Sequence, residues 1–161
     1  MKGFNEYVKE DLIFCDVCYE SKEDFFEQLS NVLREKGYVK EGFARSIKER
    51  ERRYPTGLDA NPYQVAIPHT DPKHVVEPFI AVVKPREALV FQAMGSDDKV
   101  VEAEFLFVLG ITEPTKQVSL LQNVIQLFLD KETMDALLQL DQESAIYQLL
   151  KDKINRGGVC S

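Results

Sequence analysis

Apolar residues in the first third of the chain recur with the period of an amphipathic helix. Ser21 and Asp24 have the spacing of a capping box, and the apolar positions that follow lie three or four residues apart, at Phe25, Leu29, Val32 and Leu33. This pattern predicts a helix over residues 21–37, closed by Gly37. A second helix is expected from about residue 40 to residue 53, because Pro55 pushes the residue before it out of the α region.

Short apolar runs typical of strands occupy the middle of the chain. The stretch DLIFCDVC before the first helix is also expected to be a strand. Four further strands are predicted at QVAI (64–67), PFIAVV (78–83), LVFQAM (89–94) and EFLFVLGI (104–111). Helical patterns return in QVSLLQNVIQLFL, followed by two shorter helices beginning near Lys131 and Asp141. Helices before and after a block of strands predict an α/β fold, one sheet flanked by helices on both faces.

Length and composition predict a single domain. The chain has 161 residues and 44% apolar content, enough for a sizeable core. We expect one domain over residues 1–161, with a core at about 10–152 and a flexible tail at 155–161. No run approaches the ~18 apolar residues of a membrane span, and MKGFNEYVKED lacks the apolar region of a signal peptide. The expected location is therefore cytoplasmic.

Charge and missing motifs narrow the function classes. A net charge of −7 opposes attraction to nucleic acid, so no nucleic-acid partner is expected. The chain contains no G-x-x-x-x-G-K-[ST] loop, no G-x-G-x-x-G after a strand and no G-x-S-x-G elbow. The common nucleotide enzymes are thereby disfavoured.

The three cysteines indicate packing rather than chemistry. Cys15 and Cys18 form a C-x-x-C spacing, but no second pair or nearby histidine completes a zinc site. We interpret them as small apolar residues of a half-buried strand, without a structural disulfide. Cys160 lies in the expected tail.

Arg50 is the unusual member of the charged run KERERR (48–53). Most of this run is interpreted as a solvated helix face, because Glu49 and Glu51 interrupt the basic residues. Arg50, however, follows Phe43 and Ile47 at i+7 and i+3, on the apolar stripe of the predicted helix. A guanidinium in that position either forms a structural salt bridge or binds an anion, and periodicity alone leaves both open.

Both histidines of the chain lie in the stretch VAIPHTDPKH, five residues apart. Pro68 ends the predicted strand, which places His69 at a strand exit, where α/β proteins commonly build sites. Three chemistries are open to His69. It could bind a metal ion with Asp71 and His74, although this spacing matches no common zinc site.

Two further chemistries use His69 without a metal. It could act as the base for a nucleophile such as Thr70 or Ser96, or it could itself accept a phosphoryl group on one ring nitrogen. The last option requires donors for the phosphoryl oxygens, for which Arg50 and Thr56 are candidates.

Two of these motifs together resemble a known family. The pair RERRYPTGL and VAIPHT is similar to enzyme IIA of the fructose/mannitol superfamily in the bacterial phosphotransferase system, and the resemblance extends from about Ser21 to Leu150. The length, the aromatic-Pro-Thr-Gly start and the second histidine five positions after the first most resemble the galactitol-type enzyme IIA.

The resemblance implies a mixed sheet and a phosphocarrier. His69 would accept a phosphoryl group from phospho-HPr and pass it to a cysteine of enzyme IIB, while the membrane enzyme IIC carries the sugar or polyol. Arg50 would neutralise the phosphoryl oxygens. No metal, nucleotide or other cofactor is implied. Related domains of the nitrogen-regulatory branch make a regulatory phosphoprotein the alternative.

One position departs from the family pattern. Mannitol- and fructose-type members carry a second histidine in the helix after the last strand, where this chain has Lys116. We therefore expect the missing donor to be either His74 or Lys116.

Overall fold

The central element is a five-stranded sheet that is mixed, as the resemblance implied. The computed structural model describes residues 4–157. The strand order is β1 (Val8–Val17), β4 (Phe79–Pro85), β7 (Phe105–Gly110), β3 (Gln64–Ala66) and β2 (Gly57–Asp59). β1 runs parallel to β4, β4 antiparallel to β7, β7 parallel to β3, and β3 antiparallel to β2.

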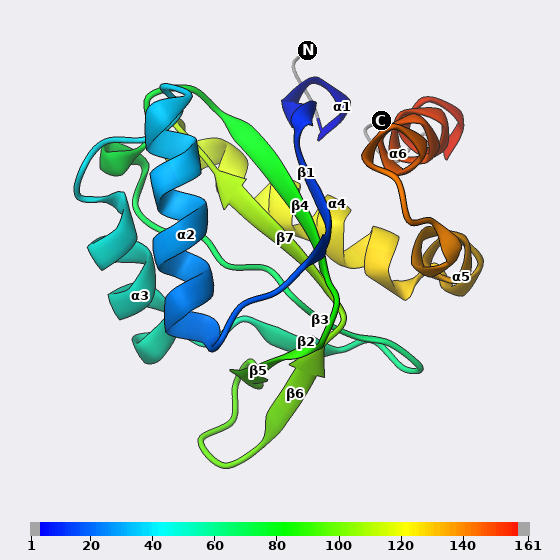
Figure 1. The fold of residues 1–161 in the computed structure, drawn as a ribbon, viewed down its shortest axis with the longest axis horizontal. Coiled ribbons are helices and arrows are strands. Elements are labelled where there is room, and N and C mark those ends of the chain that lie inside the picture. The colour runs from blue at the N-terminus through cyan, green and yellow to red at the C-terminus, as the bar shows by residue number, and fades with distance from the viewer. Residues whose placement is uncertain (1–3, 158–161) are drawn as a thin grey trace.

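Helices cover both faces of this sheet, which confirms the expected α/β fold (Figure 1). One face is covered by α2 (Lys22–Glu35) and α3 (Phe43–Arg53), and the other by α4 (Gln117–Leu129), α5 (Lys131–Gln139) and α6 (Glu143–Gly157), with the short α1 (Phe4–Tyr7) beside α6. All residues of β7 are buried because helices lie on both sides of it. Alternate side chains of this strand therefore enter two separate apolar cores.

The helix boundaries follow the local signals in most places. The Ser21 hydroxyl accepts the backbone N–H of Asp24 at 3.0 Å, and Gly37 takes the left-handed conformation, with φ +88°, just after the helix. The second helix begins at Phe43, slightly later than expected. The prediction that the last helix is short was wrong, since α6 continues for 15 residues. Residues 158–161, including Cys160, lie outside the described residues.

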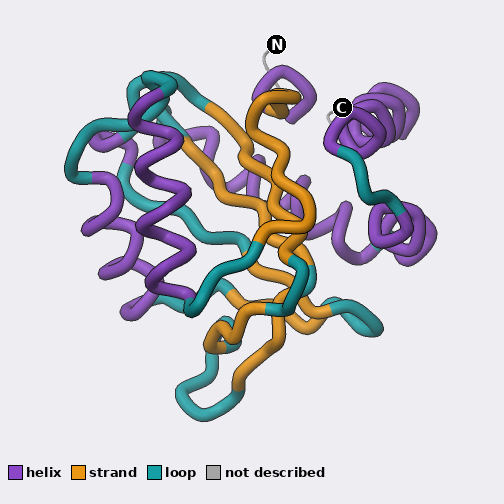
Figure 2. Tube along the Cα trace, viewed as in Figure 1, coloured by secondary structure: helices purple, strands orange, loops and turns teal. Residues whose placement is uncertain are grey.

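The strand prediction missed two short strands, and it did not foresee that one predicted strand belongs to a second sheet. β2 and β6 (Val100–Ala103) were not predicted, because a three-residue strand and the half-exposed VVEA carry little apolar signal. β5 (Leu89–Gln92) pairs with β6 in a separate two-stranded sheet that projects from the end of the main one (Figure 2). The hairpin closes against Gly57, where an added Cβ would lie 2.6 Å from the Gln92 carbonyl oxygen.

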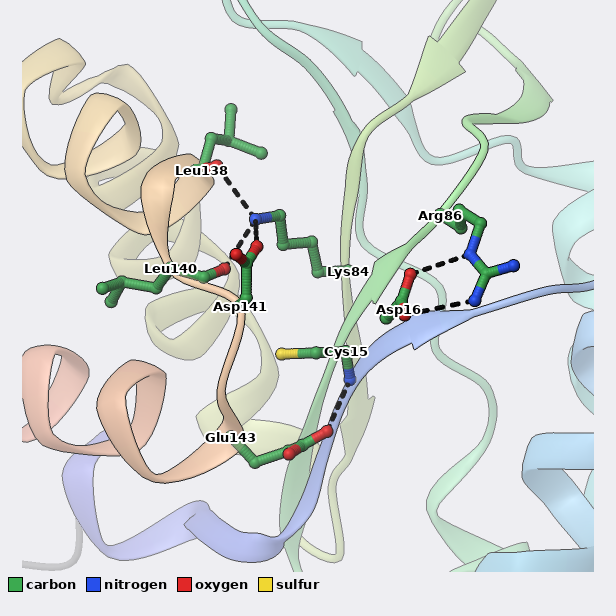
Figure 3. Close-up of polar contacts among 8 residues, drawn as sticks. All are labelled: Cys15, Asp16, Lys84, Arg86, Leu138, Leu140, Asp141 and Glu143. Atoms are coloured by element: carbon green, nitrogen blue, oxygen red, sulfur yellow. Dashed lines mark hydrogen bonds and ion pairs between the residues drawn. The ribbon is translucent and has the colours of Figure 1, made fainter.

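A polar cluster ties the link between α5 and α6 to the strands (Figure 3). The Lys84 ammonium on β4 donates to the carbonyls of Leu138 and Leu140 at 2.9 and 2.6 Å, and so satisfies carbonyls at the end of α5. On β1, the backbone N–H of Cys15 donates to the Glu143 carboxylate at 3.0 Å.

The described cysteines are both free, and Cys15 is packed as expected. Its side chain is buried in the core beneath α4 to α6, and burial raises the pKa of its thiol to about 11. Such a thiol is unreactive at neutral pH, in agreement with a packing role. Cys18 is exposed beyond the end of β1. Among residues 4–157, no helix is both long and apolar enough to cross a membrane.

Candidate functional site

His69 lies just beyond β3, where the chain runs alongside the end of β7. The backbone N–H of Leu109 on β7 donates to the Pro68 carbonyl at 3.0 Å and fixes this segment against the sheet. His69 is 7% exposed, and its Nδ1 lies 2.9 Å from the Ile67 carbonyl oxygen. A carbonyl can only accept, so Nδ1 carries the hydrogen. Nε2 is consequently the unprotonated nitrogen, with a lone pair available for attack.

The surroundings of His69 keep its imidazole neutral. Burial lowers the pKa of His69, and the nearby Arg50 charge lowers it further, against the opposing effect of the hydrogen bond to Ile67. A neutral imidazole is the form that can act as a nucleophile. Within residues 4–157 no carboxylate orients the ring, since the partner of Nδ1 is the Ile67 carbonyl, and this does not fit a base of the Ser-His-Asp type.

Arg50 carries a positive charge that its neighbours compensate only weakly. Its Nη1 lies 3.9 Å from the Asp71 carboxylate, and its guanidinium carbon lies 4.8 Å from the centre of the Tyr54 ring. Its Nε is buried without a hydrogen-bond partner among the described residues. A structural ion pair would satisfy this group, so the geometry favours the anion-binding interpretation over the salt bridge.

A cleft of about 490 Å³ opens beside Arg50. Its lining residues come from α3 and from the segment after His69: Gly42, Arg45, Ser46, Glu49, Arg50, Arg53, Tyr54, Thr70, Asp71, Lys73 and His74. Four cationic side chains against two carboxylates make this cleft positive in a protein of net charge −7. The cleft therefore suits an anion.

His74 shares this cleft with Arg50. It ends the 3-10 turn η1 (Pro72–His74), and its ring packs against the start of α3, since a Cβ on Gly42 would lie 3.0 Å from its Nδ1. Among the described residues its ring nitrogens have no hydrogen-bond partner. His69 is not itself a lining residue, but the adjacent Thr70 is.

The other two expected donors have partners elsewhere. The Thr56 hydroxyl and backbone N–H both donate to the Glu51 carboxyl, each at 2.7 Å. Lys116, in η2 (Pro114–Lys116), forms an ion pair of 3.2 Å with Glu113 and is not part of the cleft lining. Of the five predicted site residues, Arg50 and His74 line the cleft, and His69 lies next to the lining residue Thr70 and close enough to Arg50 for its pKa to be lowered by that charge.

Within the described part of the chain, the residues that the two alternative chemistries would require are not brought together. Among the side chains described, no group of three or more His, Cys, Asp or Glu residues is placed to hold a metal ion, so Asp71 and the two histidines do not form a ligand set. The Ser96 hydroxyl donates to Asp98 in the β5–β6 turn at 3.0 Å, and Ser96 is not part of the cleft lining. Thr70 hydrogen-bonds to Ser46 instead of serving as a free nucleophile.

Sequence reasoning missed two residues that the structure brings into the site region. Ser46 precedes Arg50 by four positions, so helical spacing alone could have placed both side chains on one face. Glu51 follows Ile47 by four positions and is buried, but the alternating charges around it made it resemble a solvated residue.

Comparison with known proteins identifies the family to which this chain is similar. The model of the family "Phosphoenolpyruvate-dependent sugar phosphotransferase system, EIIA 2" matches residues 6–153. The galactitol-specific EIIA component of Escherichia coli (strain K12) is 23% identical over 138 residues, covering 86% of this chain and 88% of that protein.

Solved structures show the same fold. The nitrogen regulatory protein IIA-Ntr from Neisseria meningitidis has a TM-score of 0.70 at 19% identity, covering 91% of this chain and 97% of that chain. A complex of enzyme IIAMtl with phosphorylated enzyme IIBMtl from Escherichia coli gives 0.57 at 19% identity, covering 88% of each chain. The chain belongs to the EIIA type-2 family of the phosphoenolpyruvate-dependent sugar phosphotransferase system, a family of phosphotransferases that act through a phosphohistidine.

Proposed function

We propose that this phosphocarrier accepts its phosphoryl group on Nε2 of His69, from phospho-HPr, and passes it to a cysteine of enzyme IIB. The observation that carries the proposal is the hydrogen bond from Nδ1–H to the Ile67 carbonyl, because it leaves Nε2 unprotonated in a neutral ring. This nucleophile lies near a guanidinium whose charge is only weakly compensated. Such a role would place the protein in the cytoplasm.

The transfer balances without a cofactor. The Nε2 lone pair attacks the phosphorus of the donor, the donor's P–N bond breaks, and its electron pair returns to the donor imidazole. Nδ1–H remains bonded to Ile67, so no proton has to leave His69 on attack. In the second step a thiolate of the acceptor attacks the same phosphorus and Nε2 leaves.

Arg50 and His74 have separate roles in this proposal. Arg50 compensates the charge of the phosphoryl oxygens, and His74, which lines the same cleft, donates a hydrogen bond to them. Thr56 and Lys116 are the less favoured donors, since Glu51 and Glu113 already engage them.

The relatives support the proposed partner and the proposed class of substrate. The structural neighbour solved with phosphorylated enzyme IIB supports an enzyme IIB as acceptor. The galactitol-specific relatives support a polyol or related sugar as the carbohydrate that enzyme IIC finally transports. Transfer to enzyme IIB also separates this role from the regulatory alternative, in which the phosphoryl group would stay on the protein.

Intact-mass spectrometry tests the acceptor residue. The protein is incubated with phosphoenolpyruvate, enzyme I and HPr, and one phosphoryl group should be added to the wild type but not to His69→Gln. Phosphorylation of a folded His69→Gln variant would contradict the assignment.

Arg50→Ala should slow phosphoryl acceptance by ~2–4 kcal/mol in the barrier if Arg50 binds the transferring oxygens. The exposed Arg52 on the same helix provides the matched control, because Arg52→Ala removes the same charge outside the cleft lining. Equal rates for the two variants would mean that Arg50 has a structural role.

His74→Ala should cause a partial loss in the rate of phosphoryl acceptance, whereas Lys116→Ala should leave that rate unchanged.

A further inference from the structure

Glu51 is a buried carboxyl that the transfer chemistry does not use. It lies on the apolar stripe of α3, one and two turns beyond Ile47 and Phe43, and only 3% of it is exposed. Burying a carboxyl group costs free energy unless hydrogen bonds replace its contacts with water. The contacts that Glu51 makes are therefore informative about its role.

Both oxygens of Glu51 bind one residue. Oε2 accepts the backbone N–H of Thr56 and Oε1 accepts the Thr56 hydroxyl, each at 2.7 Å. Thr56 lies between the end of α3 and the start of β2, in a connection that contains Pro55. The carboxyl thus fixes the position of this connection relative to the helix.

The connection continues by hydrogen bonds to the imidazole. The Thr56 carbonyl accepts the N–H of Ile67 at 3.3 Å, which extends the β2–β3 ladder beyond the Gly57 and Ala66 pair. The carbonyl of the same Ile67 accepts Nδ1–H of His69 at 2.9 Å. Three links therefore lead from Glu51 to the ring.

We propose that Glu51 is a positioning residue for His69, which through Thr56 and Ile67 keeps the ring hydrogen on Nδ1 and leaves Nε2 as the nucleophile. The same carboxyl joins the helix that carries Arg50 to the strand pair that leads to His69. Glu51 therefore fixes the position of the nucleophilic imidazole relative to the phosphoryl-binding guanidinium. This inference rests on the proposed role of His69.

Glu51 can keep both of its hydrogen bonds with Thr56 in either protonation state. Burial raises the pKa of this carboxyl to about 7, against the hydrogen bonds from Thr56 that lower it. Ionised, the carboxylate accepts both donors; protonated, it can donate to the Thr56 hydroxyl oxygen and still accept the N–H. A glutamine at this position can make the same two contacts, whereas a methionine fills the space and makes neither.

Histidine-selective ¹⁵N NMR at pH 8 determines which ring nitrogen of His69 carries the hydrogen. Only His69 and His74 contribute signals, and His74→Gln identifies which are which. The wild type and Glu51→Gln should show His69 protonated on Nδ1 alone. Glu51→Met should populate the tautomer protonated on Nε2 and lower kcat/KM for phosphoryl acceptance about tenfold, as loss of an outer orienting contact typically does.

A second carboxyl group that accepts two hydrogen bonds from one threonine provides the matched control. At the start of α5, Asp130 accepts the hydroxyl of Thr133 at 2.7 Å and its N–H at 3.4 Å, on the opposite side of the sheet from α3. Asp130→Ala should lower the melting temperature without changing the His69 tautomer. Thr56→Val, which keeps the N–H bond and removes the hydroxyl, should lie between wild type and Glu51→Met.

An unchanged His69 tautomer in folded Glu51→Met would overturn the proposal. The same tautomer change in Asp130→Ala would also overturn it, since the effect would then reflect general loosening. The NMR readout does not require phosphoryl transfer. A wild type with Nδ1–H on His69 that nevertheless accepts no phosphoryl group would refute the proposed function and leave the positioning role intact.

Discussion

The buried carboxyl of Glu51 predicts a specific dependence of stability on pH. Its pKa rises from the ordinary value of 4.5 to about 7 in the folded protein, chiefly because burial disfavours the ionised form. Between these two values the folded chain keeps a proton that the unfolded chain releases. The stability that this group contributes is therefore complete below pH 4.5 and is lost as pH rises to about 7.

The magnitude follows from the same numbers. At roughly 1.4 kcal/mol for each tenfold change in proton affinity, the rise corresponds to about 3 kcal/mol of unfolding free energy. Glu51→Gln removes the titration while keeping the two contacts with Thr56. The variant should therefore match the wild type near pH 4.5 and exceed it by about 3 kcal/mol at pH 8.

Urea unfolding followed by circular dichroism at several pH values between 4.5 and 8 measures this difference. All other titrating groups occur in both proteins, so they cancel when the two free energies of unfolding are subtracted. Glu49→Gln, at an exposed position of the same helix, is the control. Parallel curves for wild type and Glu51→Gln would refute the reasoning, because they would mean that Glu51 binds its proton equally in the folded and unfolded chains.

Three further predictions concern His69, Lys84 and Gly110. Because burial and Arg50 lower the pKa of His69, phosphoryl acceptance should persist as pH falls through 6.5, and a pH profile of kcat/KM that declines already above 6.5 would contradict this. Lys84→Met should remove two charge-assisted hydrogen bonds to the end of α5 and cost about 2 kcal/mol in urea unfolding, with phosphoryl acceptance unchanged in the folded variant. Gly110→Ala places a Cβ 2.0 Å from a buried Phe79 ring atom and should cost ~1–3 kcal/mol by calorimetry; an unchanged melting temperature would show that the ring moves aside without cost.

The parts of the fold that the sequence predicted are those governed by neighbours along the chain. The cap at Ser21 and the turn at Gly37 appear where the local signals placed them, because capping and left-handed glycine depend on a few adjacent residues. The separate β5–β6 sheet was missed because strand propensity does not report which strand pairs with which. The length of α6 was underestimated, because the polar stretch after Leu150 has few apolar positions to indicate that the helix continues.

The site shows the same division. The sequence by itself located His69 after a strand and Arg50 on an apolar helix stripe, since strand ends and helical periods are local properties. Only the tertiary structure decided that His74 shares the cleft with Arg50 and that Lys116 does not. It also assigned the His69 hydrogen to Nδ1 through the Ile67 carbonyl. Hydrogen-bond partners and shared clefts depend on the order and register of the strands, which bring together residues far apart in the chain and leave no periodic trace in the sequence.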